Sequence, residues 1–356
     1  MEHLVRSLVA RPVLLLAIAA GLALGDNAKA SDEQIDNPVA YTQNALRLIE
    51  KNAYYADRVN WTKAYEQALN SLGPGSSNLD AYAEIRRVLL ALGDGHSFLM
   101  TAQSAHHFDL SGEGRVEVRL ESQGIAYIRL DGYSGGDMSA IDAYVHDLSA
   151  RFDAVSVGGI CGWIVDLRQN RGGNMWPMLA GLHDILGADN LGAFIDRRGK
   201  QYPWAEGSLV QNARNPRYVD APVAVLIGNA TASSGEAIVV AFAGRPRTRT
   251  FGQPTRGLST ANHAIRLPDG AMLFLTASIF VDRTGKVYGT AISPDEASDD
   301  DSSTVSKARS WLATQPCAIP SRNNAAVVRR RTDDLALNRT GRHAASCSRA
   351  AAGPAD

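Results

Sequence analysis

Cysteine is scarce in this chain, neither sign of charge is in excess, and long apolar runs are confined to one place. Cys161, Cys317 and Cys347 are too few and too widely spaced to indicate a disulfide framework. Their pairing stays open, an odd number leaves at least one thiol unpaired, and Cys161 is interpreted as a small buried residue. The 36 basic and 37 acidic residues nearly cancel, which disfavours nucleic acid and anionic membranes as partners and favours small neutral or peptide-like ones.

The long apolar run, residues 13–24, lies near the N-terminus. Arg6 and Arg11 precede it, and the small-x-small sequence at 28–30 follows it. This order is typical of a secretory signal, so we expect residues 1–30 to be a signal peptide of an exported, periplasmic or extracellular protein. The alternative is an uncleaved anchor, and only then is a membrane a partner. Lipid attachment is not expected, because no cysteine lies near this segment.

Residues 31–110 are predicted to form an N-terminal helical cap. Apolar residues recur at helical spacing from about 37 to 92, and Gly73-Pro74-Gly75 interrupts them. The last helix ends in Gly93-Asp94-Gly95, which places His96 on a glycine-flanked loop.

Residues 111–316 alternate strand-length apolar runs with segments of helical periodicity. At 356 residues with 45% hydrophobic content, the chain can bury a large core, and this alternation predicts an α/β fold with a largely parallel sheet. After Thr260 the pattern becomes antiparallel, with Pro268-Asp269-Gly270 as a hairpin turn. The tail 317–356 has little apolar periodicity and is expected to be disordered. Expected strands are 115–120, 125–130, 162–167, 223–227, 262–267, 271–276 and 279–282, and expected helices are 138–152, 176–186, 237–243 and 303–314.

A tight turn after the apolar strand 223–227 carries Thr231, Ser233 and Ser234. A serine on a sharp strand-to-helix turn can present its hydroxyl as a nucleophile, beside N–H groups at the positive end of a helix. The alternative is that these residues cap the helix, with Glu236 completing a capping box from Ser233. The local pattern by itself favours capping.

Two further segments carry residues suited to chemistry. Gly93-Asp94-Gly95-His96 supplies an imidazole, whose ordinary pKa of about 6.5 suits a general base, although a lone histidine is more often structural. Asp166 to Gly173 (DLRQNRGG) follows a strand, and its paired glycines allow backbone N–H groups to converge on a small anionic centre. Each segment alone is weak evidence.

Together these segments resemble the S41 family of serine peptidases. The resemblance rests on the order GDGH, DLRQNRGG, TASSGE, TFGQPTRG and YGTAISPD, and it extends roughly from Leu79 to Asp295. That family includes the C-terminal processing (tail-specific) proteases, the tricorn core, the nisin-resistance proteases and retinoid-binding modules. The resemblance implies a crotonase/ClpP-like αβ catalytic core, here an S41-type peptidase core over residues 111–316.

The family's functional positions carry over to particular residues of this chain. Its nucleophile matches Ser233, with Ser234 as the fallback. In the tail-specific branch the base is a lysine at the position of Leu258, so the resemblance favours the branch that uses a histidine, here His96. The short segment between His96 and the strand at Arg115 implies that there is no PDZ domain.

An oxyanion hole and an orienting carboxylate would complete such a site. The backbone N–H groups of Ser234 and of Gly172 or Gly173 are candidates for the oxyanion hole, each worth about 3–4 kcal/mol of the barrier. Asp94 and Asp295 are equal candidates for orienting the histidine: Asp94 is close in sequence, with capping of its own loop as the alternative, and Asp295 lies in the S-P-D turn.

Arg168 is a candidate for substrate binding, because a guanidinium matches a C-terminal carboxylate bidentately. The favoured alternative is an internal ion pair with Asp166 or Glu236, since an arginine at the end of a strand usually has a partner within the protein.

Aromatic and histidine residues outside the motifs give weaker signals. Trp176 and Trp204 are candidates for lining a substrate groove, with packing in the core as the alternative. His106 and His107 have no third ligand at metal spacing, so neither a metal nor a cofactor is expected.

The sequence thus predicts an exported serine endopeptidase that acts on peptide or protein substrates. It forms an acyl-enzyme on Ser233 with His96 as general base, and the substrate C-terminus is a candidate position of cleavage. The alternative is a non-catalytic module that binds an apolar ligand or peptide on the same fold. A lipase or esterase is less favoured, because the G-x-S-x-G elbow is half matched, with Gly235 after Ser233 but Thr231 before it.

Overall fold

The computed structural model describes residues 37–110, 113–157, 159–204 and 215–317. The predicted signal peptide and the predicted disordered tail, apart from Cys317 itself, lie outside these ranges. Within them, no helix is both long and apolar enough to cross a membrane.

The described part of the chain begins with helices that pack on one another and on a long strand. Asn37 caps the first helix, where its Oδ1 accepts from the N–H of Ala40 at 3.0 Å, and Pro38 takes a position that needs no N–H donor. The apolar faces share one core with Leu273 and Leu275. The elements are α1 (Pro38–Asn52), η1 (Ala56–Arg58), α2 (Trp61–Ser71) and α3 (Asn78–Ala91).

The sheet that supports the loops at 166–173 and 228–233 has the strand order β11-β8-β7-β4-β3-β2. Its strands from β3 to β11 run parallel, and β2 pairs antiparallel with β3. Every residue of β4 and β7 is buried, as expected of parallel strands covered on both faces. This confirms the α/β class and the largely parallel sheet. The strands are β2 (Glu113–Leu120), β3 (Ile125–Ser134), β4 (Gly162–Asp166), β7 (Val223–Ile227), β8 (Thr248–Gly252) and β11 (Glu296–Ala297), and η2 (Ser122–Gly124) joins β2 to β3.

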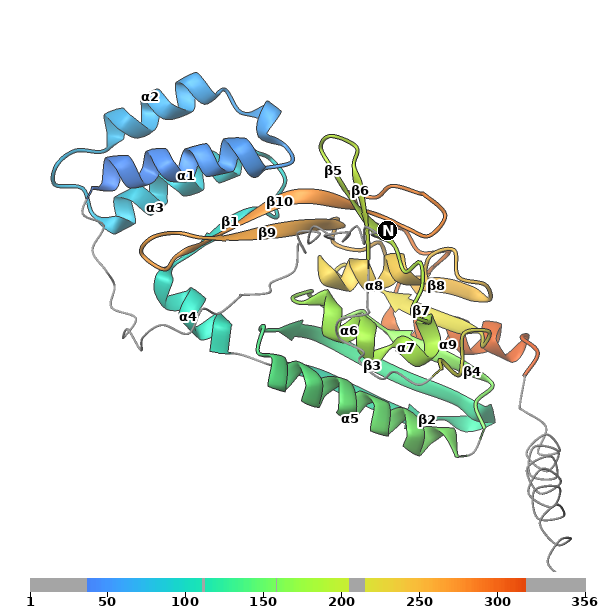
Figure 1. Cartoon of the computed structure of the whole chain (residues 1–356). Helices are drawn as coiled ribbons and strands as arrows, with labels where there is room; N and C mark the ends of the chain where they lie inside the picture. The colour runs from blue at the N-terminus through green and yellow to red at the C-terminus, as the bar shows by residue number, and fades with distance from the viewer. Residues whose placement is uncertain (1–36, 111–112, 158, 205–214, 318–356) are drawn as a thin grey trace, which may run out of the picture. The chain divides into compact units, whose positions relative to one another are not determined.

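Helices cover both faces of this sheet (Figure 1). Alternate residues of a strand point to opposite faces, so Trp163 and Val165 share a core with α5 to α8, whereas Ile164 packs with α9. The predicted helix 176–186 is interrupted at Leu182, and the predicted helix 237–243 begins earlier. The helices are α5 (Met138–Ser156), α6 (Met175–Gly181), α7 (His183–Leu186), α8 (Ser234–Phe242) and α9 (Asp301–Ala313).

A second, antiparallel sheet has the order β1-β10-β5-β6, with β9 also paired to β10. The predicted hairpin at Pro268-Asp269-Gly270 is confirmed by the pairing of Met272 with Arg266. The strands predicted at 271–276 and 279–282 form one strand, because the chain passes through an irregularity after Thr276 without turning. The elements are β1 (Phe98–Met100), α4 (Ala102–Leu110), β5 (Ala193–Asp196), β6 (Gln201–Pro203), β9 (Thr260–Arg266) and β10 (Met272–Val281).

A disulfide bond joins Cys161 to Cys317. The pairing that the sequence left open is therefore decided for these two residues, and Cys161 is half-buried rather than fully buried. The two residues are 156 positions apart, so their sequence spacing carried no sign that β4 and the end of α9 lie together. Cys347 lies outside the described residues, and the absence of a PDZ domain stays a prediction.

Candidate active site

The turn after β7 holds Ser233 in an unusual backbone conformation. Thr231 Oγ1 donates to the carbonyl of Leu167 at 2.8 Å and accepts from the N–H of Gly228 at 3.0 Å, which ties the turn to the end of β4. Ser233 has φ 52° and ψ −120°, a region that non-glycine residues rarely occupy and that costs about 1–3 kcal/mol. Since α8 begins at the next residue, Ser233 lies at the apex of a strained strand-to-helix turn.

A buried carboxylate holds this turn against the loop after β8. Glu236 Oε2 accepts from the N–H groups of Ser233 at 2.9 Å and Leu258 at 2.8 Å, and Oε1 accepts from Gly257 N–H at 3.0 Å and Thr255 Oγ1 at 2.5 Å. Burial raises the pKa of Glu236, while these hydrogen bonds favour its charged form. Glu236 therefore does bind the N-cap, as the capping interpretation expected. An ordinary N-cap has extended backbone, however, so capping does not explain the positive φ of Ser233.

The Gly172-Gly173 turn after β4 packs directly against this serine. A Cβ atom at Gly172 would lie 2.8 Å from Ser233 Cβ and 3.1 Å from Ser234 N, so the approach requires glycine. Ser234 Oγ donates to the carbonyl of Gly173 at 2.5 Å. The N–H of Gly172 already donates to Asn170 Oδ1 at 3.0 Å, which makes the N–H groups of Gly173 and Ser234 the stronger oxyanion candidates.

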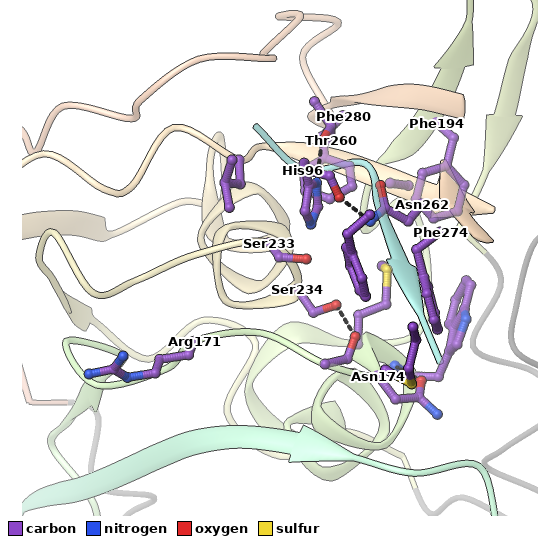
Figure 2. Close-up of a pocket in the computed structure, with 17 residues that line it drawn as sticks. His96, Arg171, Asn174, Phe194, Ser233, Ser234, Thr260, Asn262, Phe274 and Phe280 are labelled. Carbon is purple, nitrogen blue, oxygen red and sulfur yellow. Dashed lines mark hydrogen bonds between the residues drawn. The ribbon is translucent and has the colours of Figure 1, made fainter. Parts of the chain in front are cut away.

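His96 lies on the loop between α3 and β1 and is fixed by two residues of β9. Its Nδ1 is 2.6 Å from Thr260 Oγ1, and its backbone carbonyl accepts from Asn262 Nδ2 at 2.9 Å. In Figure 2 the ring lies over the Ser233 side chain, with Thr260 on its far side. Burial lowers the pKa of His96 to about 4, against the opposing attraction of the Asp94 carboxylate. The imidazole is therefore neutral at pH 7.

Neither of the carboxylates expected to orient His96 forms a hydrogen bond with its ring. Asp94 caps its own loop, where it accepts from the His96 N–H at 3.0 Å and from Ser97 Oγ at 2.6 Å. Asp295 Oδ2 accepts from the N–H and the hydroxyl of Thr250, both at 2.8 Å, on β8. The group bonded to the ring is instead the neutral hydroxyl on β9.

His96, Ser233 and Ser234 line one cavity of about 330 Å³ (Figure 2). Most of the remaining lining is apolar, and β1, β5, β10 and α6 contribute its aromatic and methionine side chains. In Figure 2, Phe194 and Phe274 lie on one side of Ser233 and Arg171 lies on the other. The cavity is therefore suited to a large apolar side chain. Its other lining residues are Phe98, Met100, Gly173, Asn174, Met175, Trp176, Phe194, Leu258, Thr260, Ala261, Asn262 and Phe280.

The candidate substrate-binding residues lie in different environments. Arg168 Nη2 is 2.6 Å from Asp166 Oδ2 and its Nη1 is 2.9 Å from Asp301 Oδ1, and Arg168 is not among the cavity-lining residues. The internal ion pair is thus confirmed, and a substrate grip by Arg168 is not supported. Trp176 borders the cavity, whereas Trp204 is buried in the core. In the described ranges, there is no cluster of three or more His, Cys, Asp or Glu side chains that could bind a metal ion.

Sequence reasoning missed the residues that the antiparallel sheet contributes. Thr260 is 164 positions from His96, and a threonine in a strand gives no local sign of a histidine partner. Phe98, Phe194 and Phe274 come from three separate strands. Their sequence signal is aromatic content in strands, which does not distinguish a cavity wall from a core.

Part of this site lies in a segment that matches a known family. Residues 124–298 match the sequence profile of Peptidase family S41. The chain carries a peptidase S41 domain. The matched range of this domain includes Ser233 and both glycines, whereas His96 precedes it.

Similar proteins place the S41 domain among peptidases. The nisin-resistance protein of Lactococcus lactis subsp. lactis is 28% identical over 296 residues, which cover 78% of this chain and 88% of that protein. The carboxyl-terminal-processing protease of Synechocystis sp. (strain ATCC 27184 / PCC 6803 / Kazusa) is 25% identical over 175 residues, 49% of this chain but 38% of that protein. The solved structure of a lipoprotein from Streptococcus agalactiae is 27% identical with a TM-score of 0.70, covering 78% and 96% of the two chains. The fold is that of S41 proteases, and the family is one of peptidases that act on peptides or proteins.

Proposed function

We propose that this protein is an exported serine endopeptidase that uses Ser233 as nucleophile and His96 as general base. The observation that carries the proposal is that both side chains line one cavity, with Ser233 at the apex of a strained turn. Because His96 Nδ1 is bonded to Thr260, its Nε2 is the ring nitrogen available to a proton on the serine hydroxyl.

The reaction begins when Ser233 Oγ attacks the substrate carbonyl and His96 Nε2 takes the hydroxyl proton. A neutral imidazole is needed for this step, and the low pKa of His96 supplies it. The imidazolium then donates the proton to the leaving amine, which departs with the C-terminal part of the substrate. Water then attacks the acyl-enzyme carbonyl while the same histidine takes a proton from it. The bond between the acyl carbon and Ser233 Oγ breaks, the histidine returns the proton to Oγ, and the N-terminal part of the substrate leaves with a new carboxyl group.

The negative oxygen of the tetrahedral intermediate binds to the N–H groups of Ser234 and Gly173. Ser234 is the first residue of α8, so its N–H lies at the positive end of a helix. Gly173 is held beside it by the hydrogen bond from Ser234 Oγ to the Gly173 carbonyl. Each donor is expected to contribute about 3–4 kcal/mol to lowering the barrier.

The proposed substrate is an extended peptide with a large apolar side chain next to the cleaved bond. The aromatic wall of the cavity supports this choice, because it removes apolar surface from water. Cleavage toward the substrate C-terminus is supported by the name of the Synechocystis relative, a carboxyl-terminal-processing protease. Export is supported by the N-terminal sequence and by the similar lipoprotein structure.

Labelling with a fluorophosphonate tests the nucleophile, and peptide cleavage tests the pair. We expect the label on Ser233, and we expect Ser233→Ala and His96→Ala each to remove cleavage of a peptide library followed by mass spectrometry. Ser139→Ala and His146→Ala, both at exposed positions on α5, are matched controls that keep full activity.

The outcome that contradicts this proposal is full turnover in both site variants. Saturable peptide binding without cleavage, unchanged in Ser233→Ala, would favour the non-catalytic binding module instead.

A further inference from the structure

A second cavity adjoins the first one at Arg171, which lies on the opposite side of Ser233 from Phe274 (Figure 2). Its volume is about 350 Å³, and it shares Arg171 and Leu258 with the first cavity. Ala232, the residue before the nucleophile, also borders it, together with Asn229, Ala230 and Arg256. A peptide that fills the first cavity and passes Ser233 therefore enters the second.

Two guanidinium groups in this second cavity have no carboxylate partner among the residues that the structure describes. Arg171 and Arg256 are exposed, and neither forms an ion pair with another residue in the described part of the chain. Arg168, by contrast, is paired with two aspartates. Neither cavity is lined by an Asp or Glu from the described ranges. The second cavity thus carries positive charge that no acidic side chain of the described residues compensates.

The backbone holds both arginines next to the reacting groups. Arg171 directly precedes the Gly172-Gly173 turn, and the N–H of Arg256 donates to the carbonyl of Thr231 at 2.8 Å, within the nucleophile turn. Both positions are therefore fixed by the same loops that fix Ser233.

We propose that Arg171 and Arg256 bind a carboxylate of the peptide substrate. This inference rests on the proposed function and adds a substrate class to it: peptides with an apolar side chain on one side of the cleaved bond and a carboxylate on the other. Guanidinium groups bind carboxylates through paired, charge-assisted hydrogen bonds. Because an extended chain advances ~3.3 Å per residue and the cavities adjoin, the carboxylate lies within a few residues of the cleaved bond.

The experiment compares internally quenched peptides that differ only in charge. Each contains Phe followed by one to four residues, and each is made with a free C-terminal carboxylate, as the amide, and as the amide with one Asp after Phe. The full chain is compared with Arg171→Ala, Arg256→Ala and the double variant. Arg198→Ala is the matched control, an exposed arginine that lines a different cavity. The free-carboxylate and Asp series distinguish a chain terminus from a side chain as the source of the carboxylate.

We expect a carboxylate to raise kcat/KM by about 10- to 100-fold over the amide. In the double variant, kcat/KM should be similar for the carboxylate and amide peptides, whereas Arg198→Ala should keep the gain and the wild-type rate on the amide. The proposal is overturned if neither carboxylate series is favoured, or if the gain persists in the double variant.

Equilibrium binding separates this inference from the catalytic mechanism. The same labelled peptides are titrated into Ser233→Ala and followed by fluorescence anisotropy. One outcome is that the wild-type chain cleaves no peptide, while carboxylate peptides bind more tightly than amide peptides and this difference in affinity disappears when the arginines are replaced. In that case the peptidase proposal fails and the carboxylate site stands. Equal affinity for acid and amide peptides refutes the carboxylate site even if cleavage by Ser233 is established.

Discussion

The environment of His96 predicts a peptidase that keeps its activity in mild acid. Burial lowers the pKa of His96 to about 4, whereas an ordinary histidine titrates at about 6.5. At pH 5.5 the neutral imidazole then makes up about 97% of the population, compared with about 9% for an unshifted histidine. Because only the neutral form accepts the serine proton, kcat/KM at pH 5.5 should be about tenfold higher than an ordinary histidine would allow.

The assay is kcat/KM for one amidated, uncharged peptide between pH 3.5 and 8.5, since such a substrate has no carboxylate to titrate. We expect a plateau that falls with a midpoint near pH 4. Folding must be followed in parallel by circular dichroism. The unfolded chain binds a proton at His96 below about pH 6.5 and the folded chain only near pH 4, so falling pH removes up to about 3 kcal/mol of stability in this window.

A midpoint near pH 6.5 in folded protein would refute this account of the histidine environment. Fluorophosphonate labelling of Ser233 over the same pH range provides an independent measure, because the rate of labelling depends on the same proton acceptor. Agreement of the two midpoints assigns the titration to the free enzyme rather than to the substrate.

Three further predictions concern the groups around the serine and the disulfide. Thr260→Val removes the hydrogen bond to the imidazole at nearly constant shape and should lower kcat by about 10- to 100-fold with little change in KM. Thr260→Ser keeps the hydroxyl and should retain most of the wild-type kcat, so equal kcat in both variants would contradict a positioning role. Gly172→Ala introduces a Cβ 2.8 Å from Ser233 Cβ at a φ of 99°, so fluorophosphonate labelling of Ser233 should be lost and urea unfolding should show at least about 1–3 kcal/mol of destabilisation. A fully active variant would show that the turn can relax. Replacing Cys161 and Cys317 with serine should lower stability by about 3–5 kcal/mol without changing kcat, because the bond joins the residue before β4 to the segment that follows α9, and neither cysteine lines the cavity. A loss of kcat in folded protein would link the disulfide to the site.

The elements that the sequence predicted well are those with a strong local signal. The buried strand Val223–Ile227 and the hairpin at Pro268-Asp269-Gly270 agree with the structure, since apolar runs and turn residues are local signals. The short strands β1, β5 and β6 were not predicted, because three or four residues give too little pattern. The start of α8 was placed too late, because the small polar residues at its beginning suit a turn equally well.

For the candidate site, local motifs identified the backbone frame but not the partners of its side chains. The glycine turn and Ser233 were found by motif and lie in contact. Asp94 and Asp295 were named as candidates to orient His96, yet a hydroxyl from β9 occupies that position. Asp94 is close to His96 along the chain, but its carboxylate is bonded to its own loop.

The sequence by itself determined which residues of this protein are capable of chemistry: a serine in a tight turn, paired glycines after a strand, and a histidine on a flexible-looking loop. Only the tertiary structure decided which of them meet and which remaining charges are unpaired. The reason is physical, since side-chain identity and local backbone preference are properties of neighbouring residues. The pairing of His96 with Thr260, of Arg168 with Asp301, and of Cys161 with Cys317 depends instead on how distant strands and helices pack.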